Sequence, residues 1–197
     1  VQYLEKDREL LSFVSRHVSN LLKRKVTEKK LQHLALHDAL TGLANRTLFL
    51  DRVSHALKKQ DRQGQRLCAV LYMDVDLFKT INDRYGHAVG DALLTKFAHL
   101  LTQQTRQLDT VARLGGDEFA LFLEDIDTQE TAVHLAERII QALQQPIAAN
   151  EALIICSTSI GIAFAHDTSL SASEIIRRAD AAMYQAKAAG RGHFQLY

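Results

Sequence analysis

Apolar residues in the first 36 positions recur at the alternating three- and four-residue spacing of a helix that pairs with another helix. Leu11, Val14, Val18 and Leu21 form this a/d seam, which breaks in the charged stretch 23–30. A helix of this length would be ~50 Å long, more than a small domain can cover. Two interpretations stay open: a solvated helix that caps its own domain, and the one we favour, a linker that pairs with a partner and joins an upstream domain to the next.

From residue 37 onward, apolar runs of strand length alternate with segments of helical period. The run 67–73 is continuously apolar and predicts a buried strand, while 110–113 and 118–123 predict a hairpin. The remaining pattern predicts a helix through Phe49, Val53 and Leu57, helices over 91–101, 131–143 and 173–189, and strands over 153–164, with a bend at Gly161, and over 194–197. Hairpins combined with helical crossovers predict an α/β (α+β) fold with a mixed or antiparallel sheet.

Net charge, hydropathy and cysteine content argue against some classes of function and predict the cellular compartment. The 197 residues carry 24 Lys and Arg against 23 Asp and Glu, a net charge of +1, which argues against a domain that grips nucleic acid by its phosphates. No apolar run is long enough for direct membrane insertion, and the N-terminus does not resemble a signal peptide. Cys68 and Cys156 lie in apolar, strand-like runs, which predicts buried thiols and a cytoplasmic location. Because no initiator Met is present, we expect a piece of a longer protein, with a linker helix at 1–36 and a folded domain at 37–197.

Two acidic pairs stand at the ends of predicted strands. Asp74 and Asp76 follow one strand, and their two-residue spacing puts both carboxylates on the same side. Asp117 and Glu118 follow a Gly-Gly turn at the tip of the predicted hairpin. Carboxylates gathered at adjacent strand ends form a hard oxygen site that suits Mg²⁺, which also seeks substrate phosphates. Cations to pair with phosphates are supplied by Lys79, Lys187 and Arg191. The pattern predicts metal-assisted phosphoryl transfer.

Four segments carry motifs in a fixed order. Arg113-Leu114-Gly115-Gly116-Asp117-Glu118-Phe119 contains Gly-Gly-Asp-Glu-Phe, and three further motifs lie in 37–46, 74–91 and 179–191. Together they resemble the GGDEF family, the diguanylate cyclases, over residues ~36–197. The resemblance implies a palm-like fold similar to adenylyl cyclase catalytic domains. It also implies condensation of two GTP into cyclic di-GMP with release of two pyrophosphates, in a homodimer whose domains each hold one GTP.

The resemblance assigns roles to individual residues. Asp74 and Asp117 would hold Mg²⁺, or Mn²⁺, with the Val75 carbonyl as a further ligand. Glu118 would serve the second metal or act as the general base. The substrate-binding set comprises Asn82 and Asp91, which would read guanine, Lys79, Lys187 and Arg191, which would neutralise the triphosphate, and Phe78 and His87. Asp38 and Asn45 would brace the fold near this site.

Two further segments match features outside the catalytic site. Arg106 and Asp109 fit the family's Arg-x-x-Asp product-inhibition site, where bound cyclic di-GMP would hold the domains in an unproductive arrangement. Arg138, on a later predicted helix, is a candidate second arginine. The helix at 1–36 resembles the linker that follows a GAF-type sensor domain, which would carry dimer geometry from sensor to cyclase.

Two alternatives to an active cyclase remain. A catalytically silent member would bind GTP or cyclic di-GMP and regulate a neighbouring domain, such as a phosphodiesterase domain after Tyr197. A pure interaction module would act through its helix alone, and alanine at Asp117 would leave it unharmed. The intact acidic signature, Lys79, Asn82 and Asp91 favour the cyclase.

Overall fold

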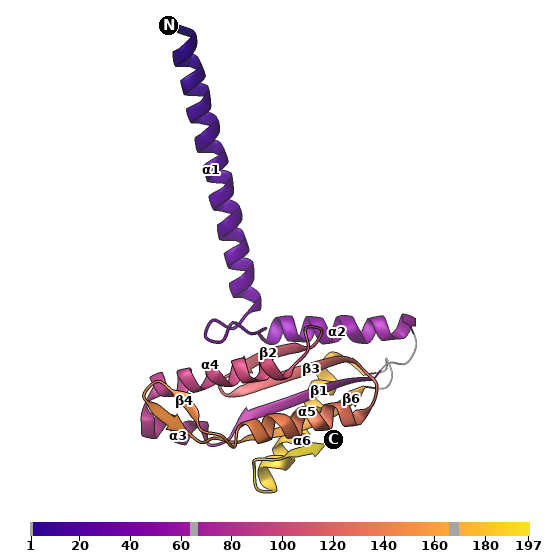
Figure 1. Cartoon of the computed structure of the whole chain (residues 1–197). Coiled ribbons are helices and arrows are strands. Elements are labelled where there is room, and N and C mark those ends of the chain that lie inside the picture. The colour runs from indigo at the N-terminus through magenta and orange to yellow at the C-terminus, as the bar shows by residue number, and fades with distance from the viewer. Residues whose placement is uncertain (1, 64–66, 166–169) are drawn as a thin grey trace. The chain divides into compact units, whose positions relative to one another are not determined.

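The computed structural model describes residues 2–63, 67–165 and 170–197, and the chain divides into two compact units, residues 1–37 and 38–197. The first unit is one helix, α1 (Gln2–Leu36), drawn in indigo in Figure 1. Leu11, Val18 and Leu21 of the predicted seam are exposed. The side chains of Val14 and of 26–33 lie outside the described ones. Helix formation agrees with the periodicity, and pairing of α1 stays a prediction.

A five-stranded sheet with the order β2-β3-β1-β6-β7 forms the centre of the second unit. The strands are β1 (Leu67–Val75), β2 (Thr110–Gly115), β3 (Glu118–Ile126), β6 (Thr158–Ala165) and β7 (Phe194–Leu196). β1 lies antiparallel to both β3 and β6, β2 pairs antiparallel with β3, and β7 runs parallel to β6. A separate small hairpin joins β4 (Ile147–Ala149) to β5 (Ala152–Ile154). The predicted mixed α+β fold is confirmed.

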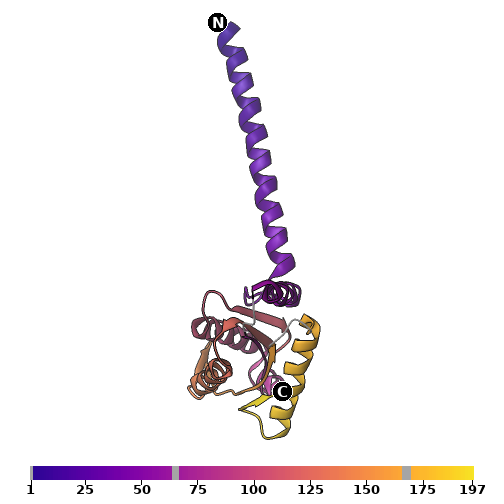
Figure 2. The same cartoon turned by 90° about the vertical axis from the view of Figure 1, so that its right-hand side faces the viewer.

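Helices cover both faces of the sheet (Figures 1 and 2). One face packs against α4 (His87–Gln104) and α5 (Gln129–Ala142), and the other against α2 (Arg46–Gln63) and α6 (Ala172–Ala188). Alternate residues of β1 enter the two resulting cores, with Leu71 and Met73 on the first side and Val70 and Tyr72 on the second. Burial on both faces explains why β1 is a continuous apolar run in the sequence.

Two local predictions were incomplete or wrong. An eight-residue helix, α3 (Phe78–Tyr85), precedes α4, and Gly86 with φ 85° joins the two. The predicted strand over 153–164 is interrupted, because β5 ends at Ile154 and β6 begins at Thr158. β6 pairs with β1 without interruption through Gly161, and the predicted bend there stays a prediction. A Cβ there would overlap the backbone of α6 at Ala179 and Met183, so this glycine permits α6 to pack closely. No helix in the described ranges is long and apolar enough to cross a membrane.

Candidate active site

The end of β1 and the β2–β3 turn bring the predicted acidic residues together. Asp74 lies directly across the antiparallel ladder from Glu118, and the Val75 N–H donates to the Asp117 carbonyl at 3.2 Å. Residues 115 and 116 of the turn have φ values of 154° and 50°, and the second lies in the left-handed region that glycine tolerates. Cross-strand pairing thus places Asp74, Asp117 and Glu118 at one sheet end.

A half-buried arginine, Arg113, braces the turn that carries these acids. Arg113 donates to the Gly116 carbonyl through Nε at 2.9 Å and Nη2 at 2.7 Å, and its Nη1 lies 3.0 Å from Asp38 Oδ1. The Asp38 carboxylate also accepts from the Thr41 backbone and hydroxyl. These hydrogen bonds outweigh the effect of burial and lower the pKa of Asp38. Asp38 therefore supports the Gly-Gly turn indirectly, because it holds the Arg113 side chain that donates to the Gly116 carbonyl. The sequence predicted no role for Arg113.

Asp74 is the buried member of the acidic group. Its carboxylate lies 2.8 Å from Lys187 Nζ, which reaches it from the last turn of α6. Burial is the largest influence and raises the pKa of Asp74; Asp117 and Asp76 raise it further, while Lys187 opposes them. Burial and the neighbouring carboxylates therefore destabilise the ionised form of Asp74. A bound cation would stabilise that form.

Asp76 does not join this group. Its carboxylate accepts hydrogen bonds from Ser157 Oγ at 2.6 Å, Ser159 Oγ at 2.7 Å and the Gly192 N–H at 3.1 Å. These three donors come from the start of β6 and from the loop after α6. Asp76 therefore fastens that loop, which carries Arg191, to the sheet. The expectation that both carboxylates of the Asp-x-Asp pair line the site is corrected: Asp74 lines it and Asp76 supports it.

A buried polar atom lies where α3 packs against α4. The Asn82 amide oxygen is buried at this contact and has no hydrogen-bond partner among the described residues. Gly90, one helix away, makes room for it, because a Cβ at Gly90 would overlap that oxygen and would lie 2.9 Å from Asn82 Cγ and 3.1 Å from the Phe78 ring. A buried amide oxygen without a donor is costly unless a ligand supplies one. This arrangement gives Gly90 a role that the sequence analysis did not assign.

The other predicted substrate contacts are exposed around these elements. Lys79 lies in the first turn of α3, His87 and Asp91 near the start of α4, and Arg191 in the loop after α6, where its φ is 63°. Within the described residues no three His, Cys, Asp or Glu side chains are arranged to chelate a metal unaided. Two carboxylates and the Val75 carbonyl still fit Mg²⁺, because this ion usually completes its shell with water and substrate phosphate.

A separate cavity of about 250 Å³ contains the predicted inhibition residues. Its lining comprises Gln104, Thr105, Arg106, Asp109, Leu123, Ile126, Thr131, Leu135 and Arg138. The Arg106 N–H donates to Asp109 Oδ2 at 2.8 Å, and Arg138 Nη2 donates to the Gln104 carbonyl at 2.7 Å. Burial raises the pKa of Asp109, against the effect of Arg106. The structure brings Arg138 from α5 to the same cavity as Arg106 and Asp109.

Comparison with known proteins agrees with this geometry. Residues 35–193 match the family model described as the diguanylate cyclase GGDEF domain. The chain is 43% identical over 169 residues to the bifunctional diguanylate cyclase/cyclic di-GMP phosphodiesterase MucR of Pseudomonas aeruginosa, a match covering 86% of this chain and 24% of MucR. The diguanylate cyclase TpbB of the same organism is 42% identical over 84% of this chain and 38% of its own length.

Solved structures extend the comparison. The crystal structure of the TpbB GGDEF domain superposes with a TM-score of 0.75 at 40% identity, covering 79% of this chain and 97% of that one. The coiled coil and GGDEF domain of DgcB from Caulobacter crescentus superposes with a TM-score of 0.85 at 23% identity, covering 95% and 99%. The latter likeness shows the fold, including a long N-terminal helix. The chain thus spans less than half the length of MucR and TpbB.

Proposed function

The chain belongs to the GGDEF-domain family, and we propose that it is a diguanylate cyclase that condenses two GTP into cyclic di-GMP. In each of two equivalent steps, the 3′ oxygen of one GTP bonds to the α-phosphorus of the other and pyrophosphate leaves. The observation that carries the proposal is the convergence of Asp74, Asp117 and Glu118 at one sheet end, beside Lys187. When bound there, Mg²⁺ or Mn²⁺ would activate the attacking oxygen and stabilise the leaving pyrophosphate.

The chain's own groups bind and orient the triphosphate. Asp74, Asp117 and the Val75 carbonyl would hold the metal, with Glu118 at a second metal or as the base that takes the 3′-hydroxyl proton. Lys187 already reaches the site, and Lys79 and Arg191 stand on the flanking α3 and on the loop that Asp76 fastens. Such cations stabilise charge that develops on phosphoryl oxygens.

The proposed specificity for guanine rests on Asn82 and Asp91, where α3 meets α4. The guanine N1–H and exocyclic amine are donors, and the unpartnered Asn82 oxygen and the Asp91 carboxylate are acceptors. Adenine lacks an N1–H, so bound ATP would leave a buried acceptor unpaired. A site built to hydrogen-bond a substrate rejects such an analogue strongly. GTP is therefore the proposed substrate, with Phe78 and His87 as further proposed contacts.

The assembly we propose is a homodimer, since one domain offers one GTP site and the reaction joins two GTP. Leu11, Val18 and Leu21 expose apolar surface along α1, which suits pairing with a second copy of the helix. A sensor domain upstream would act by changing that pairing. Cyclic di-GMP bound at Arg106, Asp109 and Arg138 would inhibit the enzyme.

Turnover tests the proposal directly. The protein is incubated with GTP and Mg²⁺ at two protein concentrations beside Asp117→Ala, and nucleotides are resolved by chromatography. We expect cyclic di-GMP from the wild type alone, with a rate that rises faster than linearly with protein. Bound GTP without product at any concentration would instead support the second candidate, a silent GTP- or cyclic di-GMP-binding module.

A further inference from the structure

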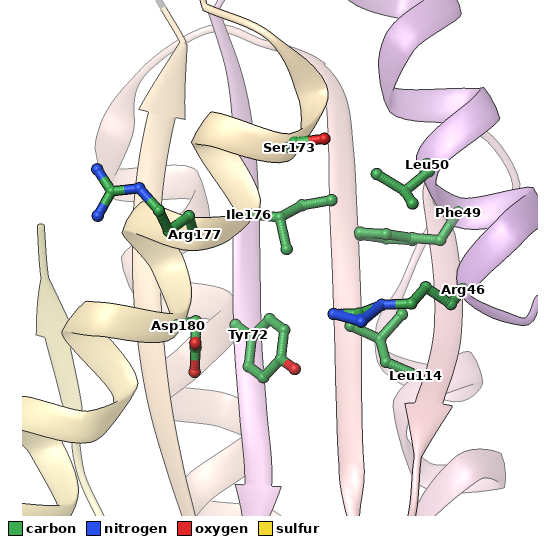
Figure 3. Close-up of a pocket in the computed structure, with 9 residues that line it drawn as sticks. All are labelled: Arg46, Phe49, Leu50, Tyr72, Leu114, Ser173, Ile176, Arg177 and Asp180. Atoms are coloured by element: carbon green, nitrogen blue, oxygen red, sulfur yellow. The ribbon is translucent and has the colours of Figure 1, made fainter.

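A cavity of about 370 Å³ opens between α2 and α6 on the face of the sheet that carries Tyr72 (Figure 3). Its lining comprises Arg46, Phe49, Leu50, Tyr72, Leu114, Ser173, Ile176, Arg177 and Asp180. Figure 3 shows the Arg46 side chain extending into the cavity from α2 and Asp180 on the opposite wall, with the Tyr72 ring between them. None of these residues belongs to the substrate set described above, yet Tyr72 connects this cavity to the acidic group.

Tyr72 precedes Asp74 by two residues on β1, so both side chains leave the strand on the same side. Its side chain is 3% exposed, and its hydroxyl is hydrogen-bonded to the Glu118 carboxylate. Glu118 is the residue directly opposite Asp74 on the neighbouring strand. An ionised carboxylate only accepts hydrogen bonds, so the Tyr72 phenol is the donor here.

We propose that Tyr72 is a positioning residue: its hydroxyl holds the Glu118 carboxylate in the orientation that would serve the metal. The inference rests on the proposed function for its consequence in catalysis. A glutamate has three side-chain torsions, and at the end of a strand it needs a fixed partner to keep one geometry. Hydrogen bonds of this kind, from a neighbouring group to a metal ligand, set the ligand's orientation.

Two charged residues line the cavity beside Tyr72, Arg46 from α2 and Asp180 from α6, and they act on its hydroxyl with opposite sign. Without the hydroxyl, the Glu118 carboxylate would lose the partner that Tyr72 provides. An oxygen ligand of the proposed metal would then lose its fixed orientation.

The test measures metal affinity, which does not require turnover. Mn²⁺ is titrated by electron paramagnetic resonance into the wild type and Tyr72→Phe, each saturated with a GTP analogue that lacks the 3′-hydroxyl. We expect Tyr72→Phe to bind the metal about 10-fold more weakly. Tyr184→Phe, a tyrosine that is 71% exposed on α6, is the matched control and should bind as the wild type does.

A double-mutant cycle separates positioning from packing. In the Glu118→Gln background, Tyr72→Phe should weaken Mn²⁺ binding by less than twofold, because the group through which it acts is already changed. Equal losses in both backgrounds, or wild-type affinity in Tyr72→Phe, would overturn the inference. Turnover under saturating metal is the second readout: kcat should fall while KM for GTP changes by less than twofold. If the wild type binds metal but makes no product, the proposed function fails and the metal titration still decides the role of Tyr72.

Discussion

Lys187 and Asp74 form an ion pair of 2.8 Å at the place where the proposed metal would bind. The lysine lies in the last turn of α6, and the aspartate lies near the end of β1, 113 positions earlier in the sequence. A lysine that occupies a carboxylate oxygen would compete with a metal for it. A bound triphosphate would offer the lysine a second anionic partner and release the oxygen. We therefore expect metal and nucleotide binding to be coupled through Lys187.

Lys187→Met tests this coupling, because it should change two affinities in opposite directions. Without nucleotide, Mn²⁺ should bind more tightly than to the wild type, because Asp74 has lost its competing cation. With nucleotide, KM for GTP should rise about 10-fold, because a charge contact with phosphate is missing. Mn²⁺ titration and steady-state kinetics measure the two effects. Lys58→Met, at an exposed lysine on α2, is the control, and parallel weakening of both ligands in Lys187→Met would contradict the competition.

Asp74→Asn should stabilise the fold while abolishing activity. Burial raises the pKa of Asp74, so the folded state binds its proton more tightly than the unfolded state does. The stability linked to that proton is present below the unfolded pKa, about 4, and is lost as pH rises through the higher folded value. At pH 7 the variant should therefore melt above the wild type, although it loses the ion pair with Lys187. Thermal melts from pH 7 to 4 should show the difference shrinking; a difference that grows toward acid would be the opposite sign.

Gly90→Ala should separate nucleotide binding from stability. The added Cβ would overlap the Asn82 amide oxygen, and the short Asn side chain can turn away, so the helices need not move. Alanine also favours a helix interior over glycine by about 1 kcal/mol. We expect KM for GTP to rise at least 10-fold, discrimination against ATP to fall, and the melting temperature to change by only a few degrees. Lys96→Ala, on the exposed side of the same helix, is the control; wild-type KM in Gly90→Ala would remove Asn82 from guanine recognition.

The sequence predicted the elements whose pattern is periodic and the residues that lie close together along the chain. β1 and the hairpin follow from continuous apolar runs, and the acidic turn is a contiguous motif. α3 was not predicted, because Ile81 is the one buried residue among its eight and the segment has little apolar periodicity. The role of Asp76 was not predicted, because the groups that donate hydrogen bonds to its carboxylate lie 81, 83 and 116 positions away in the sequence. Local spacing predicts Asp74 and Asp76 on one side of a strand, and only the tertiary fold shows that distant donors hold the Asp76 carboxylate.

Ser159→Ala tests whether Asp76 has a structural role, in contrast to the metal-binding role proposed for Asp74. Ser159 and Asp76 are both buried, and the serine hydroxyl donates to Asp76 Oδ1 at 2.7 Å. Its removal leaves a buried carboxylate oxygen without a donor and should cost about 1.5–3 kcal/mol of unfolding free energy. Urea denaturation measures this loss beside Ser173→Ala, an exposed serine on α6. Because the Asp76 carboxylate stays in place, affinity for Mn²⁺ should remain within twofold of the wild type; a large loss of metal affinity with intact stability would place Asp76 among the metal ligands.

Arg138→Ala addresses the second cavity. Arg138 comes from α5, whereas Arg106 and Asp109 lie between α4 and β2, so a ligand that contacts all three joins separate elements. Arg138 lies on the opposite side of the sheet from α2 and α6 and lines no part of the proposed GTP site, so its loss should leave the initial rate within twofold of the wild type.

Inhibition should respond differently, because a guanidinium that binds a base edge or a phosphate contributes strongly to affinity. We expect the cyclic di-GMP concentration that halves the initial rate to rise about 10-fold or more in Arg138→Ala. Initial rates with added cyclic di-GMP measure it, with Arg52→Ala at an exposed arginine of α2 as the control. Equal inhibition of Arg138→Ala and the wild type would restrict the product site to Arg106 and Asp109. Cyclic di-GMP would then bind to Arg106 and Asp109 without a contact to α5.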